Sequence, residues 1–219
     1  MASTVEASKR ASKNNTHEET TTTRKRKAQQ DGATVKKPKQ THSSDATAHL
    51  SKPIIINRAP VLHLWSASVA QFLHPDLPWD SCLSIGSAVS SLCAISKGRS
   101  IGVIEPKDSE AKSKKEKQGE EVAVMGFHLR IEDGAVLLGG KAKAANGEGL
   151  RKKFGEEGYQ AARHAFRQGL ASWEGCEDEL DGKAFHMYER FRPSVAGGQR
   201  GWGRKGELSL EEVRSVVSR

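Results

Sequence analysis

Two apolar helices joined by a short turn are predicted for residues 60–96, whose sequence is PVLHLWSASVAQFLHPDLPWDSCLSIGSAVSSLCAIS. Pro60 suits the first turn of a helix, and apolar side chains then recur at helical spacing as far as Leu73. The histidine and prolines that follow end this helix, and Asp80 is a suitable N-cap for the second. We expect the two helices to form the core of a folded domain.

The second predicted helix, residues 80–96, combines apolar residues with a set of small ones. Its small residues would let another backbone approach closely, and they are Gly86, Ser87, Ser90 and Ser91. The helix is expected to stop at Ser96-Lys97-Gly98-Arg99, where Gly98 could adopt a positive φ.

Working outward, the pattern predicts short strands on both sides of this pair and further helices toward the C-terminus. A charged segment with one alanine as its only apolar side chain, residues 106–121, is predicted to be a solvated insertion loop. Glu132-Asp133-Gly134 is typical of a hairpin turn, and Ser209-Leu210-Glu211-Glu212 of a capping box. The expected strands are 54–56, 101–105, 122–131 and 135–144, and Gly139-Gly140 is expected to form a bulge or bend in the last of them. The expected helices are 148–173, 177–191 and a short one after Ser209. Gly155 or Gly158 could break the first of these helices.

The predicted fold class is therefore α+β, a mostly helical single domain with a small antiparallel hairpin or sheet over residues 52–219. Residues 1–51 differ sharply in composition, since all twelve aromatic residues of the chain lie after Lys52. A segment so poor in apolar residues cannot offset the entropy cost of ordering, so a disordered tail is predicted there.

The tail carries ten basic and five acidic residues, which is +5 of the chain's net charge of +8. Seven of its basic residues form two clusters separated by eight residues, a pattern typical of a bipartite nuclear import signal. The alternatives are non-specific attraction to a nucleic-acid backbone and a solvated charge run that nothing binds. The import hypothesis predicts a nuclear protein and an import receptor as partner, through Arg24, Lys25, Arg26, Lys27, Lys36, Lys37 and Lys39.

Motifs of the common enzyme classes and metal sites are absent from the sequence. There is no nucleophile elbow, zinc-protease motif, phosphate-binding loop or paired CxxC, and no two of the eight histidines are three or four residues apart. His63 is predicted to be a core or boundary residue, and Cys82 and Cys93 are predicted to be buried. No uncharged run reaches the roughly 18–20 apolar residues of a membrane span. We therefore expect no catalytic residue, cofactor, metal or membrane contact.

Two basic, glycine-containing segments are the best candidates for a binding surface. Lys97 and Arg99 belong to the first, and the second combines three cations with one tryptophan. Arginine and lysine contact phosphates, and an exposed tryptophan can stack on a base, although Trp202 could instead pack inward as an anchor. Arg190 and Arg192 would extend a positive face if exposed. The predicted nucleic-acid-binding residues are Lys97, Arg99, Arg200, Trp202, Arg204 and Lys205.

Four segments of the sequence resemble a family of uncharacterised small proteins, with fungal members that carry a basic N-terminal extension and shorter bacterial members. These segments are Arg58-Ala59-Pro60-Val61, Leu64-Trp65, Ser96-Lys97-Gly98-Arg99 and the stretch from Arg200-Gly201-Trp202-Gly203 to Lys205-Gly206-Glu207-Leu208. The resemblance covers about residues 52–105 and 150–219. It implies no activity.

The sequence thus favours a non-enzymatic nuclear protein that binds DNA, RNA or chromatin. A second hypothesis is a protein-interaction module in which the helix 80–96 receives a partner helix or a second copy of the chain. A third is an enzyme whose site, near Lys97 and Lys205, acts on a small anionic substrate. A deep pocket joining these two regions would favour the third hypothesis, and a flat basic face the first.

Overall fold

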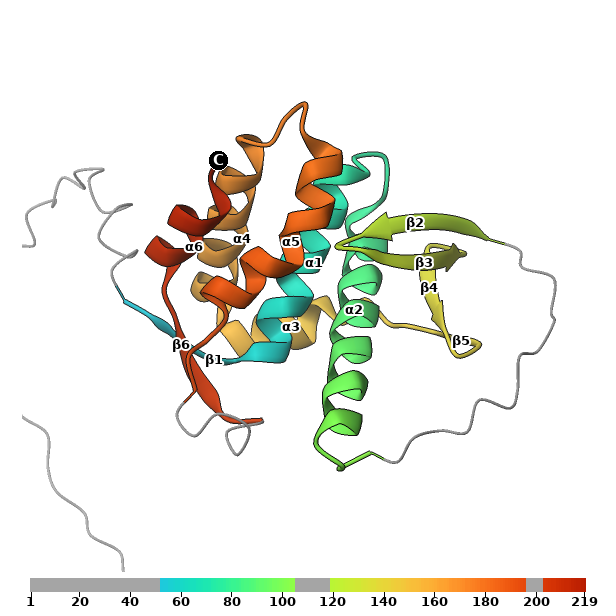
Figure 1. Cartoon of the computed structure of the whole chain (residues 1–219), viewed down its shortest axis with the longest axis horizontal. Coiled ribbons are helices and arrows are strands. Elements are labelled where there is room, and N and C mark those ends of the chain that lie inside the picture. Colours follow the sequence, from blue (N-terminus) through green and yellow to red (C-terminus); the bar gives the residue numbers. More distant parts are fainter. Residues whose placement is uncertain (1–51, 105–118, 196–202) are drawn as a thin grey trace, which may run out of the picture. The chain divides into compact units, whose positions relative to one another are not determined.

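A computed structural model describes residues 52–104, 119–195 and 203–219. Within these residues, six helices and two small antiparallel sheets form the predicted α+β fold (Figure 1). The predicted tail, with all seven import-signal residues, lies outside the described residues, and so does most of the predicted insertion loop.

Helix α1 (Arg58–Leu73) lies in the core and is buried from Pro60 to Ala70. A helix that is apolar on most of its circumference is expected to be enclosed by other elements. Trp65 is fully buried, its ring 5.2 Å from that of Phe166, and its indole N–H donates to the Ala184 carbonyl at 2.9 Å. The helix starts two residues earlier than predicted.

Helix α2 (Trp79–Ser100) packs along α1, and the two helices approach closely at Gly86. A Cβ atom there would lie 2.8 Å from Cδ2 of His63 and 3.1 Å from the Ala67 nitrogen, and closer still to the His63 carbonyl oxygen. The prediction that small residues admit a second backbone is confirmed at Gly86. The backbone that approaches is α1 of the same chain, so Gly86 is not accessible to a partner helix.

Both predicted ends of this helix are wrong. Pro78 occupies the N-cap position, so Asp80 lies within the first turn. At the other end, the helix continues to Ser100, because the following residues fold back over its last turn. Gly98 is buried there, and a Cβ atom placed on it would lie 2.5 Å from the Ile104 side chain. The predicted strand 101–105 is a turn over its described part, 101–104. The Val103 amide donates to the Gly98 carbonyl at 2.9 Å rather than to a neighbouring strand.

A four-stranded antiparallel meander lies on one side of α2, and α1, α4, α5 and α6 lie on the other (Figure 1). The predicted hairpin at Asp133 is confirmed, and Gly139-Gly140 forms the next turn. The predicted strand 122–131 is two strands, because Met125 and Gly126 both adopt positive φ and reverse the chain. The strands are β2 (Glu120–Val124), β3 (Phe127–Glu132), β4 (Ala135–Leu138) and β5 (Lys141–Ala142).

Ser84 ties this sheet to α2. Its hydroxyl donates to the Lys143 carbonyl at 2.7 Å and accepts from the Val136 amide at 2.8 Å. At the β2–β3 turn, the carboxylate of Asp181, on α5, accepts from the Met125 amide. The sheet is therefore held to α2 and to α5 by buried or partly buried hydrogen bonds.

The helix predicted for 148–173 is divided into two by Gly155, whose φ is +73°. Helix α5 has the bounds that the sequence predicts, and of the capping box before α6 the N-cap is confirmed, because the Ser209 hydroxyl accepts from the Glu212 amide. These helices are α3 (Gly147–Phe154), α4 (Glu156–Ala171), α5 (Glu177–Phe191) and α6 (Leu210–Val217).

The predicted N-terminal strand is confirmed as β1 (Ile54–Asn57), and it pairs with β6 (Lys205–Leu208). The antiparallel register places Asn57 opposite Lys205. The Asn57 side-chain amide also donates to the Gly203 carbonyl at 2.6 Å. This two-stranded sheet brings the residues before β6 beside the start of α1, although about 145 residues of chain separate them.

Candidate functional site

Three adjoining cavities follow the C-terminal half of α2, with volumes of about 240, 210 and 370 Å³. The first shares Arg58, Ala59 and Ala94 with the second, and Cys93, Lys97 and Phe185 with the third, so the three adjoin one another. We call the three cavities together the α2 groove. Its lining residues are Asn57, Arg58, Ala59, Leu62, Ser90, Leu92, Cys93, Ala94, Ser96, Lys97, Ser100, Phe127, Phe185, Tyr188, Arg192, Val195, Gly203 and Arg204.

Four cations from four segments line the α2 groove. They are Arg58 at the start of α1, Lys97 in the last turn of α2, Arg192 just after α5 and Arg204 just before β6. Within the described chain, none of the lining residues is acidic. Glu189, which lies outside the lining, approaches the Arg192 guanidinium at 3.8 Å. The groove therefore has a positive potential that attracts anions.

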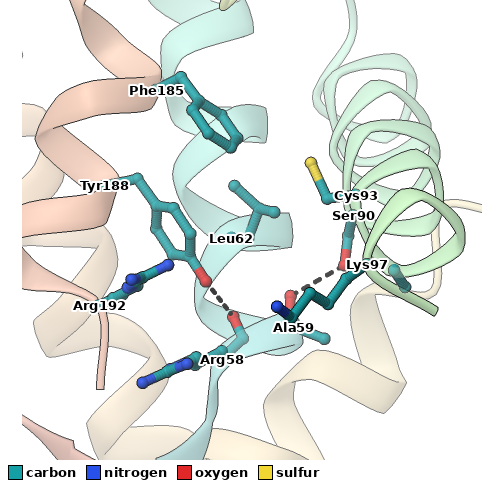
Figure 2. A pocket seen from close by; sticks show the side chains of 10 residues that line it. Arg58, Ala59, Leu62, Ser90, Cys93, Lys97, Phe185, Tyr188 and Arg192 are labelled. Carbon is teal, nitrogen blue, oxygen red and sulfur yellow. Dashed lines mark hydrogen bonds between the residues drawn. The ribbon is translucent and has the colours of Figure 1, made fainter. Parts of the chain in front are cut away.

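The cations take different directions around the first cavity (Figure 2). Lys97 extends from α2 toward the first turn of α1, and Arg192 points toward Tyr188. The Arg58 side chain leads away from this cavity, its Nε donating to the Pro193 carbonyl at 3.0 Å, and it also lines the second cavity with Arg204. Arg58 thus lies between the two cavities.

The floor of the first cavity is apolar, formed by Ala59, Leu62, Cys93, Phe185 and Tyr188. The two hydroxyl groups that line this cavity both donate hydrogen bonds to backbone carbonyls. The Tyr188 hydroxyl donates to the Arg58 carbonyl and the Ser90 hydroxyl to the Ala59 carbonyl, both at 3.1 Å (Figure 2). These bonds join α5 and α2 to the first turn of α1 and so hold the three walls of the cavity together.

The groups in the α2 groove that could react are held in their neutral forms. Burial raises the pKa of the Cys93 thiol to about 11, and burial likewise raises the pKa of the Tyr188 hydroxyl. At neutral pH, Cys93 is therefore a thiol rather than the nucleophilic thiolate. What the groove offers is positive charge around an apolar cavity, which suits binding of an anion that carries an apolar or aromatic part.

The structure brings together only some of the residues predicted for the binding surface. Lys97 and Arg204 line the α2 groove, whereas Arg99 and Lys205 are exposed and lie outside its lining. Arg200 and Trp202 lie outside the described residues. The predicted loop at Lys97 is wrong, since this residue lies on a helix; its position one turn from the helix end is what directs it across the groove.

Sequence reasoning missed Arg58 and the apolar floor, and it noted Arg192 only as an extension of a positive face. The floor residues Leu62, Phe185 and Tyr188 follow the helical pattern that marks any core position, so no local signal separates them from the core. Arg58 belongs to one of the segments quoted for the family resemblance. Three of those segments, through Arg58, Lys97 and Gly203, line the α2 groove.

His63 is a core residue, as predicted, and does not belong to the α2 groove. It is 7% exposed, and its Nε2–H donates to the Leu83 carbonyl at 2.8 Å. Its pKa is lowered from 6.5 to about 4, mainly by burial and to a smaller extent by the positive charges of Lys153 and Lys143. The imidazole is neutral at pH 7, and it contributes to the contact between α1 and α2.

Comparison of the chain with protein-family models, with curated proteins and with solved structures gave no match. The family resemblance noted from the sequence therefore stays a prediction. None of the helices in the described ranges combines the length and the apolar character that crossing a membrane requires. In those same ranges, no three His, Cys, Asp or Glu side chains are grouped so that they could hold a metal ion.

Proposed function

We propose that the protein is a non-enzymatic, nuclear nucleic-acid-binding protein and that the α2 groove contacts the phosphate backbone. The observation that carries the proposal is that Arg58, Lys97, Arg192 and Arg204 line one groove whose described lining has no acidic residue. Phosphate contacts from arginine and lysine position a protein on nucleic acid without reading its sequence.

The character of the groove supports binding rather than catalysis. Its thiol and its phenol are protonated at neutral pH, and none of its described lining residues is a histidine, aspartate or glutamate that could act as a general base. The chain's net charge of +8 adds a sequence-independent attraction to polyanions.

Reversing two groove charges, Lys97→Glu with Arg192→Glu, is expected to lower nucleic-acid affinity by about tenfold or more at low salt. It should also reduce the slope of log K against log salt by about 2, because each lost phosphate contact removes about one released counterion. The measurement is fluorescence anisotropy of a labelled oligonucleotide over a salt series. All proteins compared are full chains in which the seven import-signal residues are glutamine, so that the tail adds little to the affinity.

The matched control is Lys141→Glu with Lys153→Glu, which makes the same change in net charge at two exposed residues outside the groove. If affinity is lost equally in both double variants, the effect is one of total charge and the groove is not the binding surface.

A small anionic ligand is the second candidate, which the concave shape of the first cavity favours. A nucleoside monophosphate is a suitable probe, because it has one anionic and one aromatic part. If the groove variant abolishes binding of this probe and leaves oligonucleotide affinity unchanged, the small-ligand function replaces the proposed one.

Nuclear localisation is proposed from the two basic clusters of the tail. Changing all seven residues (Arg24, Lys25, Arg26, Lys27, Lys36, Lys37 and Lys39) to glutamine is expected to keep a fluorescently tagged chain in the cytoplasm of a eukaryotic cell. An import receptor binds extended basic side chains, and glutamine removes their charge while retaining much of their length. The same exchange at Lys9, Arg10 and Lys13 controls for general loss of tail charge. An unchanged nuclear signal in the seven-residue variant would contradict the proposal.

A further inference from the structure

We infer that the α2 groove binds single-stranded rather than duplex nucleic acid, with one unstacked base inserted in the first cavity. The inference rests on the proposed function and specifies its ligand class. What carries it is an apolar, aromatic-walled cavity that lies between cations, an arrangement that a duplex backbone alone would not occupy.

The cavity has the size and surface that a single base requires. Its volume of about 240 Å³ is slightly below the roughly 300–1,000 Å³ of pockets for drug-sized ligands, so it suits one planar heterocycle. Leu62 and Ala94 supply apolar contacts, and Phe185, which lines both this cavity and the third, supplies an aromatic ring. Bases in single strands stack on aromatic side chains in this way, with little dependence on which base is present.

The cations are placed for the phosphates on either side of such a base. Lys97 lines both the first and the third cavity, whereas Arg58 lines the first and the second and Arg204 only the second. A strand that follows the groove would therefore meet positive charge before and after the inserted base. A paired base cannot enter, because only its edges are accessible in the duplex grooves.

The hydrogen bonds made by the hydroxyl groups of the first cavity predict that the protein has only a weak preference for particular bases. The Ser90 and Tyr188 hydroxyl groups each have a single proton, and each donates it to a carbonyl of α1. No described hydroxyl donor of the first cavity is therefore left to distinguish one base edge from another. We expect the affinities for the four homopolymeric single strands to differ from one another by much less than the affinity for a single strand differs from that for a duplex.

The test compares three probes by fluorescence anisotropy: a single strand of about a dozen nucleotides, its duplex, and the same strand with abasic sites throughout. The protein is the full chain with the seven tail residues neutralised. Duplex has the higher charge density, so electrostatic attraction alone would favour it. We expect the single strand to bind on the order of tenfold more tightly than either other probe.

A variant that fills the first cavity distinguishes the contribution of the base to affinity from that of the phosphates. Ala94→Phe occupies the space between α1 and α2 without changing any charge, and it is expected to reduce affinity for the single strand to that for the abasic strand. Ala171→Phe makes the same exchange at an exposed residue of α4 outside the groove and should have no such effect. If Ala94→Phe unfolds the chain, which circular dichroism would detect, the abasic probe on the unmodified groove still decides the question.

The outcomes distinguish the inference from the proposed function. If Lys97→Glu with Arg192→Glu weakens binding but duplex and abasic probes bind as well as the single strand, the groove binds nucleic acid and the base-insertion inference is wrong. If the charge reversal changes the affinity of no probe, the proposed function itself fails.

Discussion

Replacing Gly86 with alanine is expected to lower the free energy of unfolding by about 3 kcal/mol, at the upper end of the range for overpacked positions. The added methyl group would clash with the His63 carbonyl, and it would lie 2.8 Å from Cδ2 of His63 and 3.1 Å from the Ala67 nitrogen. Two of these atoms belong to the backbone of a buried helix, so relief requires α1 and α2 to separate. Urea unfolding followed by tryptophan fluorescence, to which the buried Trp65 and Trp173 contribute, measures the loss.

Gly182→Ala is the matched control, because Gly182 also lies inside a helix but nothing lies within 4 Å of a Cβ atom placed there. Alanine has the higher helix propensity, so this variant should be stabilised by about 0.5–1 kcal/mol. If Gly86→Ala lowers the free energy of unfolding and Gly182→Ala raises it, the loss of stability comes from the contact between α1 and α2. Equal stabilities of the two variants would show that the helices do not approach as closely as described.

Lowering the pH from 6.5 to about 4 is expected to remove about 3 kcal/mol of stability through His63. The pKa of this imidazole is 6.5 in the unfolded chain and about 4 in the folded one, where burial opposes its charge. Between these values the unfolded state binds more protons than the folded state, so stability rises with pH. The contribution of neutral His63 to the free energy of unfolding is therefore complete above pH 6.5 and decreases as the pH falls toward 4. Each unit of difference between the two pKa values corresponds to about 1.4 kcal/mol.

His63→Gln tests this pH dependence, since glutamine cannot titrate in this range and its side-chain amide can still donate to the Leu83 carbonyl. We expect the variant's unfolding midpoint to vary less between pH 6.5 and 4 than that of the unmodified chain. His164→Gln, at an exposed residue of α4, controls for the loss of a histidine. A pH dependence unchanged by His63→Gln and reduced by His164→Gln would contradict the assignment.

Two elements whose limits depend on local chemistry, α5 and α6, were predicted well. Helix α5 lies between Glu177 and Phe191 as expected, because Pro193 ends the helical pattern, and α6 begins after Ser209 because that hydroxyl caps it. The end of α2 was missed because glycine was expected to stop the helix, whereas Ile104, six residues further on, folds back over Gly98 and the helix continues to Ser100. The β2–β3 turn was missed because Met125 is not a typical residue for a positive φ, and Asp181 of α5 holds it.

The candidate site was predicted only in part, for a similar reason. The sequence identified Lys97 and Arg204 as cations in unusual local settings, and it included Arg99 and Lys205, which lie outside the groove. Whether a charge lines a cavity depends on which side of its element faces the neighbouring elements, and local composition carries no such information.

The sequence by itself determined that the protein has a basic, aromatic-free N-terminal segment and an α+β domain, because composition and periodicity are local properties. Only the tertiary structure decided that Arg58, Lys97, Arg192 and Arg204 share one groove. The pairing of β1 with β6 and the packing of α2 and α5 against the first turn of α1 bring these residues together. These contacts join residues from about 30 to about 150 positions apart, and they form because distant elements must bury their apolar faces against one another.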